Sequence, residues 1–157
     1  MYSKKNIIFF IVIVFISKIQ AQQKNIKWQN ISQEKTAIGN KVDLLFKTDI
    51  NSCCYIYSVN KKAVNHSKNT SIWFLENDSF KVVGSPESIF EIEYFNRKTN
   101  QIEYIIEVEG GFAQKIEVLK PNPIIKGQIN YVLCNRNTNQ QVAQVYHFEI
   151  QLKTKNN

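Results

Sequence analysis

Alternation of apolar and polar residues runs through most of this sequence. In residues 42–50, Val42, Leu44 and Phe46 occupy every second position, and Asp43 and Lys47 lie between them. A period of two residues is that of a β-strand with one buried face. The same pattern, or a shorter apolar run, recurs at 54–59, 71–75, 90–94, 102–108, 112–119, 129–134 and 146–152. No segment shows a sustained helical period, so the sequence predicts an all-β fold.

Turn signals separate the expected strands at short intervals. They are Gly39-Asn40, Gly84-Ser85-Pro86, residues 97–100, Gly110-Gly111 and residues 121–123. Several short strands joined by regular turns predict an antiparallel sandwich or barrel. We find no internal repeat and no linker long enough to divide the chain. Residues 22–157 are therefore expected to form a single domain.

The N-terminal residues 1–21 have the composition of a secretory signal peptide. Lys4 and Lys5 precede an apolar stretch at 7–16, and Ala21 supplies a small residue for cleavage. The apolar stretch is well short of the roughly 20 residues that span a bilayer. We therefore expect a periplasmic or secreted protein that has no stable membrane span once the signal is removed.

The charge of the chain indicates no particular partner. The chain has 20 basic and 13 acidic side chains, and three of the basic ones lie in residues 1–21, which leaves a net charge of +4 after cleavage. The remaining lysines are scattered, without the basic stripe and interleaved aromatic residues that nucleic-acid binding needs. Nucleic acid is therefore not an expected partner.

The sequence lacks the motifs of most enzyme classes. His66 and His147 are the only histidines, and neither has a cysteine or carboxylate at metal-ligand spacing. The sequence contains no Gly-x-Ser-x-Gly elbow and no glycine-rich phosphate loop before a helix. We therefore expect no metal and no cofactor, and no enzymatic activity beyond residual thiol exchange through Cys134.

Three cysteines carry the remaining chemistry. Cys134 ends the strand expected at 129–134 and precedes the polar turn 135–139. In an exported chain this position suggests disulfide chemistry, which normally needs a second sulfur to resolve the mixed disulfide. The turn contains no second cysteine. Because the number of cysteines is odd, at least one thiol is free or bonds to another molecule.

Cys53 and Cys54 are the candidate partner thiols. They stand side by side at the start of the strand expected at 54–59, where neighbours should point to opposite faces, one to the core and one to solvent. One alternative is a buried small apolar residue beside an incidental thiol, and another is a strained bond between the two neighbours. A third is a bond from either one to Cys134. It would close a loop of about 80 residues and stabilise the fold by about 4 kcal/mol.

Three segments together resemble a known family. Residues 112–120, F-A-Q-K-I-E-V-L-K, lead to residues 125–134, I-K-G-Q-I-N-Y-V-L-C. They resemble the N-terminal periplasmic domain of the thiol:disulfide interchange reductase DsbD, in which an F-T-Q-K-I strand precedes a G-x-V-x-Y-x-x-C strand. The run C-Y-I-Y-S at 54–58 is similar to the family's W-H-[I/L]-Y-S strand, with Cys54 and Tyr55 replacing tryptophan and histidine. The resemblance covers roughly residues 27–152.

The resemblance implies an immunoglobulin-like β-sandwich with a cysteine pair on a hairpin. In the family this pair passes reducing equivalents to oxidised periplasmic proteins, so the implied partners are a thioredoxin-like domain or a membrane thiol reductase domain. Only Cys134 matches the first cysteine. The second is expected five or six residues later, followed by a proline, but Asn139, Gln140 and Gln141 occupy that region.

Two functional hypotheses follow. The first is an exported, stand-alone protein-binding module of envelope redox or folding processes, in which thiol exchange is degenerate or lost. Cys134 would then be the nucleophile or docking thiol, with Cys53 or Cys54 as a substitute resolving group. The second is a non-redox β-sandwich that serves as an adhesion, scaffold or binding domain, since the sandwich fold alone specifies no function.

Overall fold

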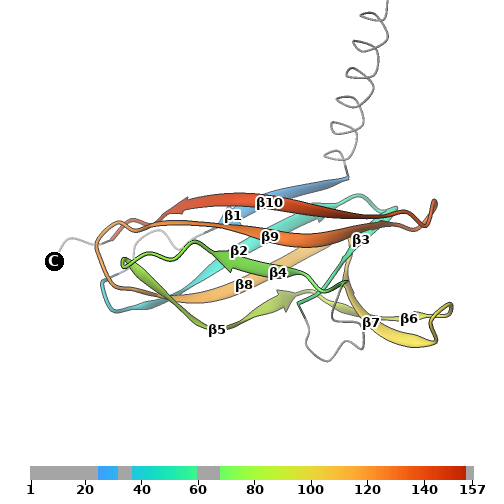
Figure 1. Ribbon diagram of the computed structural model, residues 1–157, viewed down its shortest axis with the longest axis horizontal. Coiled ribbons are helices and arrows are strands. Elements are labelled where there is room, and N and C mark those ends of the chain that lie inside the picture. The colour runs from blue at the N-terminus through green and yellow to red at the C-terminus, as the bar shows by residue number, and fades with distance from the viewer. Residues whose placement is uncertain (1–24, 32–36, 60–67, 155–157) are drawn as a thin grey trace, which may run out of the picture.

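Two antiparallel β-sheets pack face to face in the computed structural model, which describes residues 25–31, 37–59 and 68–154 (Figure 1). The prediction of an all-β antiparallel sandwich is confirmed. The described residues contain no α-helix, and so none long and apolar enough to cross a membrane. The signal peptide expected at residues 1–21 lies outside the described residues.

The smaller sheet has four strands. From edge to edge it contains β1 (Ile26–Ile31), β2 (Lys41–Ile50), β8 (Glu109–Val118) and β5 (Phe80–Ile89). Both β2–β8 and β5–β8 join strands that are distant in the chain, so the chain crosses between the sheets several times. Such non-consecutive antiparallel pairing is typical of immunoglobulin-like sandwiches.

The larger sheet has six strands, five of them in one row. From edge to edge the row contains β10 (Gln141–Gln151), β9 (Ile124–Asn135), β3 (Cys54–Tyr57), β7 (Gln101–Ile106) and β6 (Ile92–Asn96). The sixth strand, β4 (Ser71–Phe74), pairs with the first half of β9, whereas β3 pairs with its last residues.

The β6–β7 hairpin projects at the same end of the sandwich as the β9–β10 turn (Figure 1). A hydrogen bond joins the two turns, because the Lys98 ammonium donates to the side-chain oxygen of Asn139 over 3.1 Å. Two segments about 40 residues apart in the chain therefore frame one end of the molecule.

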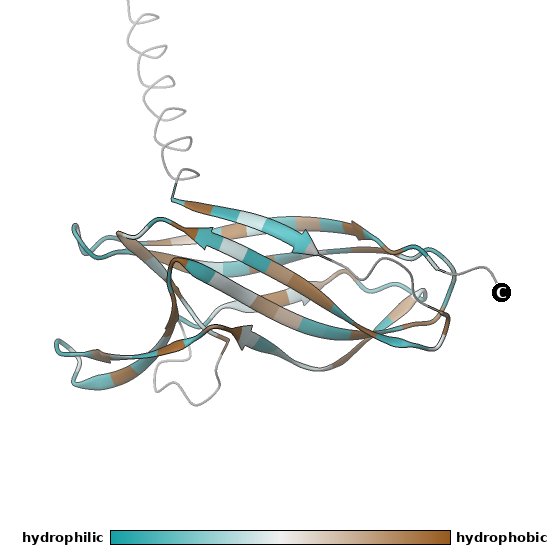
Figure 2. Ribbon diagram, turned by 180° about the vertical axis from the view of Figure 1, so that it is seen from behind, coloured by the Kyte–Doolittle hydropathy of each residue, from teal (hydrophilic) through white to brown (hydrophobic). Residues whose placement is uncertain are grey.

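The main core lies between the sheets and is formed by alternate residues of each strand. Along β2 the buried positions are Val42, Leu44, Phe46, Thr48 and Ile50, as the period of two predicts. Phe46 packs against Phe148 of β10 with ring centroids 4.7 Å apart. The alternation of apolar and polar residues along the strands is visible in Figure 2.

The turn predicted at Gly84-Ser85-Pro86 is wrong. These residues lie inside β5, where the pairing with β8 shifts register between Val83 and Glu87. Gly84 has a φ of 71°, a left-handed conformation that some β-bulges require and that glycine adopts without strain. Because β5 is an edge strand, Pro86 can lack a backbone donor without breaking a central ladder. The turn residues therefore mark a bulge and not a chain reversal.

The turn predicted at Gly110-Gly111 is also displaced. Both glycines belong to β8, and the chain reverses before them, around Val108, whose φ is 61°. Gly111 has a φ of 147°, and a Cβ placed on it would overlap the carbonyl oxygen of Phe46 in β2. Glycine here permits the close approach of two strands.

At the start of β7, the buried and exposed positions are the reverse of those predicted for residues 102–108. Ile102 was expected on the buried face and Glu103 on the exposed one, yet Ile102 is 48% exposed and Glu103 is 5% exposed. The physical reason is that the hairpin projects from the sandwich (Figure 1), so Ile102 does not pack in the main core between the sheets. Glu103 instead faces Tyr57 of β3, whose hydroxyl donates to it.

Candidate functional site

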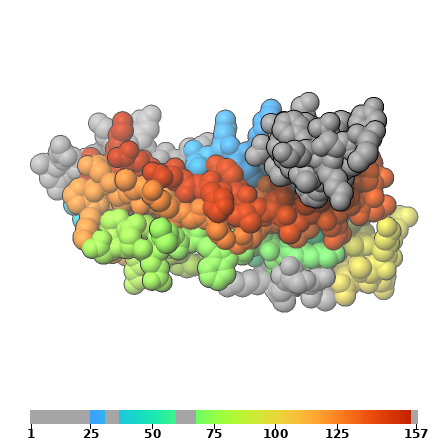
Figure 3. All heavy atoms as spheres, turned by 45° about the horizontal axis from the view of Figure 1, so that its top comes forward, coloured from blue at the N-terminus to red at the C-terminus, as the bar shows by residue number. Residues whose placement is uncertain are grey.

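Cys134 lies near the end of β9, on the face of the six-stranded sheet that points away from the main core. Its neighbour Leu133 packs in the main core, and successive side chains of a strand point to opposite faces. Tyr55 of β3 and Gln141 of β10 are its cross-strand neighbours. Figure 3 shows β9 and β10 spread across this part of the molecule, with the β6–β7 hairpin at one end.

A small second cluster buries Cys134 on this outer face. Cys134 is 2% exposed, and it packs with Tyr57 of β3 and Ile105 of β7, which are 3% and 0% exposed. Tyr55 and Val132 complete the cluster from the same sheet. The thiol is therefore enclosed by aromatic and aliphatic side chains, although it belongs to the outer surface of the sheet.

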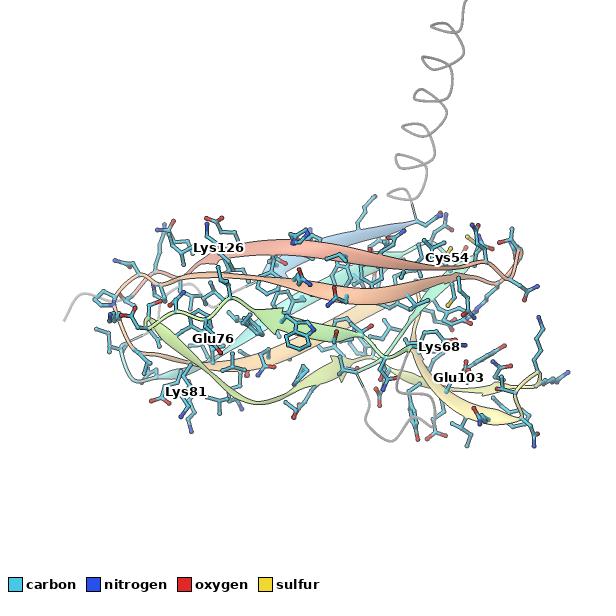
Figure 4. All side chains as sticks on the ribbon, in the orientation of Figure 1. Cys54, Lys68, Glu76, Lys81, Glu103 and Lys126 are labelled. Atoms are coloured by element: carbon cyan, nitrogen blue, oxygen red, sulfur yellow. The ribbon has the colours of Figure 1, made fainter. Side chains whose placement is uncertain are left out.

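A chain of hydrogen bonds runs through the hydroxyl of Tyr57, a member of this cluster. The Lys68 ammonium donates to the Tyr57 hydroxyl over 3.3 Å, and the Tyr57 hydroxyl donates to Glu103 over 3.4 Å. The Asn96 amide donates to the other oxygen of Glu103 over 3.0 Å. Lys68 and Glu103 lie at the same end of the molecule in Figure 4. The buried carboxyl group thus receives a donor on each oxygen.

A cleft of about 740 Å³ opens in front of Cys134. Its walls include Tyr94 of β6 and Arg136 of the β9–β10 turn. The Tyr55 ring lies between them, 6.1 Å from the Tyr94 ring and 5.3 Å from the Arg136 guanidinium. Arg136 also forms an ion pair with Glu107. Aromatic residues and arginine are enriched at the centres of protein interfaces, so the lining suits a protein ligand.

Burial raises the pKa of the Cys134 thiol above its ordinary value of 9.0. Hydrogen bonds with Tyr55 and Tyr57 act in the opposite direction, as does the charge of Lys68, but burial has the larger effect. Burial likewise raises the pKa of Tyr55 to about 12. Because the thiolate is the nucleophilic form, burial makes Cys134 less reactive than an exposed cysteine.

Cys53 and Cys54 lie on the other side of the sheet from Cys134. Cys54 is 1% exposed and belongs to the main core, and the half-buried Cys53 packs against the same core. All three cysteines are free. Because the side chains of Cys54 and Cys134 point away from each other, a bond between them would need the backbone to move.

The turn where the family's second cysteine is expected contains only polar side chains. Asn135 caps the turn by accepting from the backbone N–H groups of Asn137 and Thr138, and Asn139 adopts a φ of 56°. Residues 136–140 are exposed. Of the three cysteines, Cys134 alone lies on the outer face.

Several site residues have no signal in the local sequence. Tyr57, Lys68 and Asn96 were not expected at the site, and Glu103 was expected on an exposed position. The contact between Tyr57 and Glu103 spans 46 residues of sequence, so no local pattern predicts it. A hint does exist in Tyr55-x-Tyr57, since this spacing places two tyrosines on one face of β3.

The residues that the structure describes contain no cluster of three or more histidine, cysteine or acidic side chains able to hold a metal. His147 is exposed on β10, as its place on the polar face of the strand predicted. His66 lies outside the described residues.

Comparisons with known proteins identify the fold. No protein-family model and no curated protein matches the chain. Among solved structures, the reduced N-terminal domain of DsbD from Neisseria meningitidis is 12% identical, with a TM-score of 0.56 over 83% of this chain and 88% of that one. The N-terminal periplasmic domain of ScsB from Proteus mirabilis is 8% identical, with a TM-score of 0.55 over 82% of this chain and 46% of that one. The chain thus matches less than half of the ScsB structure, and it shares an immunoglobulin-like β-sandwich fold with both.

Proposed function

We propose that the chain is a protein-binding module of envelope redox or folding processes, and that it receives its partner in the cleft in front of Cys134. The observation that carries the proposal is the position of Cys134. It lies at the base of a cleft lined by aromatic side chains and an arginine, on the β9 strand that resembles the cysteine strand of the interchange family. The fold shared with the N-terminal domains of DsbD and ScsB supports the same assignment.

The partner implied by the resemblance is a thioredoxin-like domain or a membrane thiol reductase domain. Such a partner would contact the exposed parts of Ile92 and Tyr94 on β6, which are 40% and 39% exposed and line the cleft on the same face. β6 is the edge strand of its sheet, so the partner can approach from its free side. The signal peptide expected at residues 1–21 supports an exported location, and the ScsB domain is itself periplasmic.

Thiol exchange at this site is expected to stop at the mixed disulfide. The Cys134 thiolate would attack one sulfur of a partner disulfide, form a bond to it and release the other sulfur as a thiolate. Release of the partner then needs a second thiol on the same face, and Cys53 and Cys54 lie on the opposite one. Cys134 therefore acts as a docking thiol and not as a catalyst of turnover.

Trapping of a partner tests this proposal. The probe is a thioredoxin-like domain that retains only its attacking cysteine, activated as a mixed disulfide with thionitrobenzoate. We expect a covalent adduct with the wild-type protein and with Cys53→Ala, and none with Cys134→Ser. Undiminished trapping by Cys134→Ser would refute the role of this thiol.

Non-covalent binding of the same thioredoxin-like domain, with its attacking cysteine replaced by serine, tests the cleft. We expect Tyr94→Ala to weaken binding about tenfold or more, because exposed interface aromatics commonly contribute more than 1.4 kcal/mol. Trp73→Ala is the matched control, since Trp73 is an exposed aromatic residue whose neighbour Gln128 lies about 20 Å along β9 from Cys134. Equal losses from both variants would contradict binding in the cleft.

A non-redox β-sandwich that binds or supports another protein is the second candidate. The burial of Cys134 favours it, because a thiol that is 2% exposed and has a raised pKa reacts slowly. Trp73 on β4 and Leu75 directly after it favour it too, since they expose 63% and 65% of their surface well away from the thiol. Binding of the probe at Trp73, without any adduct at Cys134, would select this function.

A further inference from the structure

Two thiols meet at the turn that leads into β3. The Sγ atoms of Cys53 and Cys54 lie 3.1 Å apart, about 1 Å more than a disulfide bond. Neighbours within a strand would diverge, but β3 begins at Cys54 and Cys53 belongs to the preceding turn. Freed from strand geometry, the Cys53 side chain packs against the same core as Cys54. The expectation that one thiol faces the core and the other faces solvent therefore holds in part: Cys54 is buried, whereas Cys53 is partly exposed but packs against the same core.

The backbone around the pair is held on both sides. The N–H of Cys54 donates to the carbonyl of Asn51 over 2.8 Å, and the N–H of Arg136 donates to the carbonyl of Cys53 over 2.8 Å. The side-chain amide of Asn135 donates to the Cys53 sulfur over 3.8 Å. These contacts place the two sulfurs together while both cysteines are still reduced.

Exposure differs between the two thiols and suggests an order of reaction. Cys53 is half-buried, so a small disulfide can reach it, whereas Cys54 is 1% exposed beneath it. An incoming reagent would therefore meet Cys53 first, and Cys54 would be positioned as the group that displaces it.

We propose that Cys53 and Cys54 form a dithiol–disulfide couple of their own, separate from Cys134. The oxidant is a small-molecule disulfide such as oxidised glutathione. Cys53 loses its proton and attacks one sulfur of the reagent, which forms a mixed disulfide and releases one thiol. Cys54 then loses its proton and attacks the Cys53 sulfur, which closes the Cys53–Cys54 bond and releases the second thiol. Two electrons pass from the protein to the reagent.

The resulting bond would be strained. Adjacent Cα atoms lie about 3.8 Å apart across a trans peptide, whereas disulfides usually join Cα atoms 4.4–6.8 Å apart. Strained disulfides are reduced more easily and are the labile or regulatory ones. The bond closes almost no loop, so it has little entropic effect on the unfolded chain. The pair is thus a reversible redox site and not a structural crosslink.

Thiol counting on the purified Cys134→Ser protein tests the couple, because only Cys53 and Cys54 remain. The protein is incubated with oxidised glutathione, denatured, treated with N-ethylmaleimide and weighed by intact mass spectrometry. We expect no maleimide and no glutathione adduct, and a mass two hydrogen atoms below that of the dithiol. Reduced glutathione should then restore two maleimide adducts.

Three results would overturn the couple: two maleimide adducts after oxidation, a stable glutathione adduct, or a bond that reduced glutathione fails to reopen. In the Cys54→Ala and Cys134→Ser double variant, we expect glutathione to stay on Cys53, since no neighbour displaces it. Absence of that adduct would contradict entry through Cys53.

Wild-type protein provides a second measurement if Cys134→Ser folds poorly. Trypsin should release residues 48–61 with both cysteines in one peptide. That peptide should carry the bond while Cys134 carries maleimide. A bond from Cys134 to either cysteine would contradict the inference. The couple does not depend on partner binding at Cys134, so failure of either proposal leaves the other testable.

Discussion

Replacing Tyr57 by phenylalanine removes the hydroxyl that donates to the buried carboxyl group beside Cys134 and accepts from Lys68. The Tyr57 hydroxyl, in a side chain 3% exposed, donates over 3.4 Å to one oxygen of Glu103. The structure contains a matched control, because the hydroxyl of Tyr104 donates to Glu93 over the same 3.4 Å on the exposed surface. The two Tyr→Phe variants therefore differ in the burial of the bond to the carboxylate and in the contact with Lys68 that Tyr57 also makes.

The expected loss of stability depends on which hydrogen bonds remain after each substitution. Without the Tyr57 hydroxyl, one oxygen of Glu103 loses its donor, while the other retains the Asn96 amide. A buried group left unpaired costs about 1–3 kcal/mol, and the length of the original bond places the loss near the middle of that range, at about 1.5 kcal/mol. For Tyr104→Phe, water takes the place of the lost hydroxyl as the donor to Glu93, and the loss of stability should stay below about 0.5 kcal/mol.

Urea unfolding of the three proteins measures the difference. With a slope of about 1.5–2 kcal/mol per molar, Tyr57→Phe should lower the midpoint by about 1 M without changing the slope. Tyr104→Phe should lower it by less than about 0.3 M. Equal midpoints for the two variants would refute the reasoning, since burial would then make no difference to the bond.

Two further predictions concern β8 and the thiol pair. Gly111→Ala should unfold the protein or lower its stability by more than about 3 kcal/mol, because the added Cβ would meet backbone atoms of Phe46. Gly84→Ala, with open space around it, should cost about 1–2 kcal/mol. Thermal melts that rank the two variants the other way would contradict this. The second prediction uses the pKa of Cys54, which burial and the neighbouring thiols raise from 9.0 to about 12, against a smaller opposite effect of Arg136. The unfolded chain then releases this proton near pH 9 and the folded chain keeps it, so stability should fall above pH 9, by up to about 1.4 kcal/mol per pH unit. Urea midpoints at pH 8 and 10.5 should fall further for the wild type than for Cys54→Ala, and parallel falls would show that Cys54 does not contribute.

The strands at the centre of the sandwich were predictable because one face of each is buried along its whole length. In β2 the apolar positions of the sequence are the buried positions of the structure. In β9 the buried residues include Ile129, Tyr131 and Leu133, as their spacing predicts. Wherever a strand is covered on one side by the opposite sheet, the hydrophobic effect aligns the sequence period with the fold.

At the edges this relation fails. β5 was not expected as a strand, because Gly84 and Pro86 indicate a turn when taken alone. On an edge strand the same residues form a bulge, and only the pairing with β8 distinguishes the two outcomes. The β6–β7 hairpin lacks a covering sheet, so Ile102 is exposed even though its spacing predicts burial.

In the candidate site, the sequence indicated one residue and did not indicate the residues around it. The chemistry of a cysteine at the end of a strand indicated Cys134, but its surroundings depend on strands far away in the chain. Tyr57 and Glu103 meet only because β3 pairs with β7. The Cys53–Cys54 contact likewise depends on Cys53 lying in the turn that precedes β3 and not in the strand itself.

The two faces of β9 are subject to different constraints on which residues can be replaced. Residues at odd positions, such as Tyr131 and Leu133, face the main core, so their replacement would be selected against through folding. Val132 and Cys134, at even positions, face the small outer cluster and the cleft. A substitution there alters what the surface can bind or react with while leaving the packing between the sheets in place. A sandwich of this kind can therefore lose or regain a thiol chemistry by single substitutions, at positions where the main core imposes no requirement.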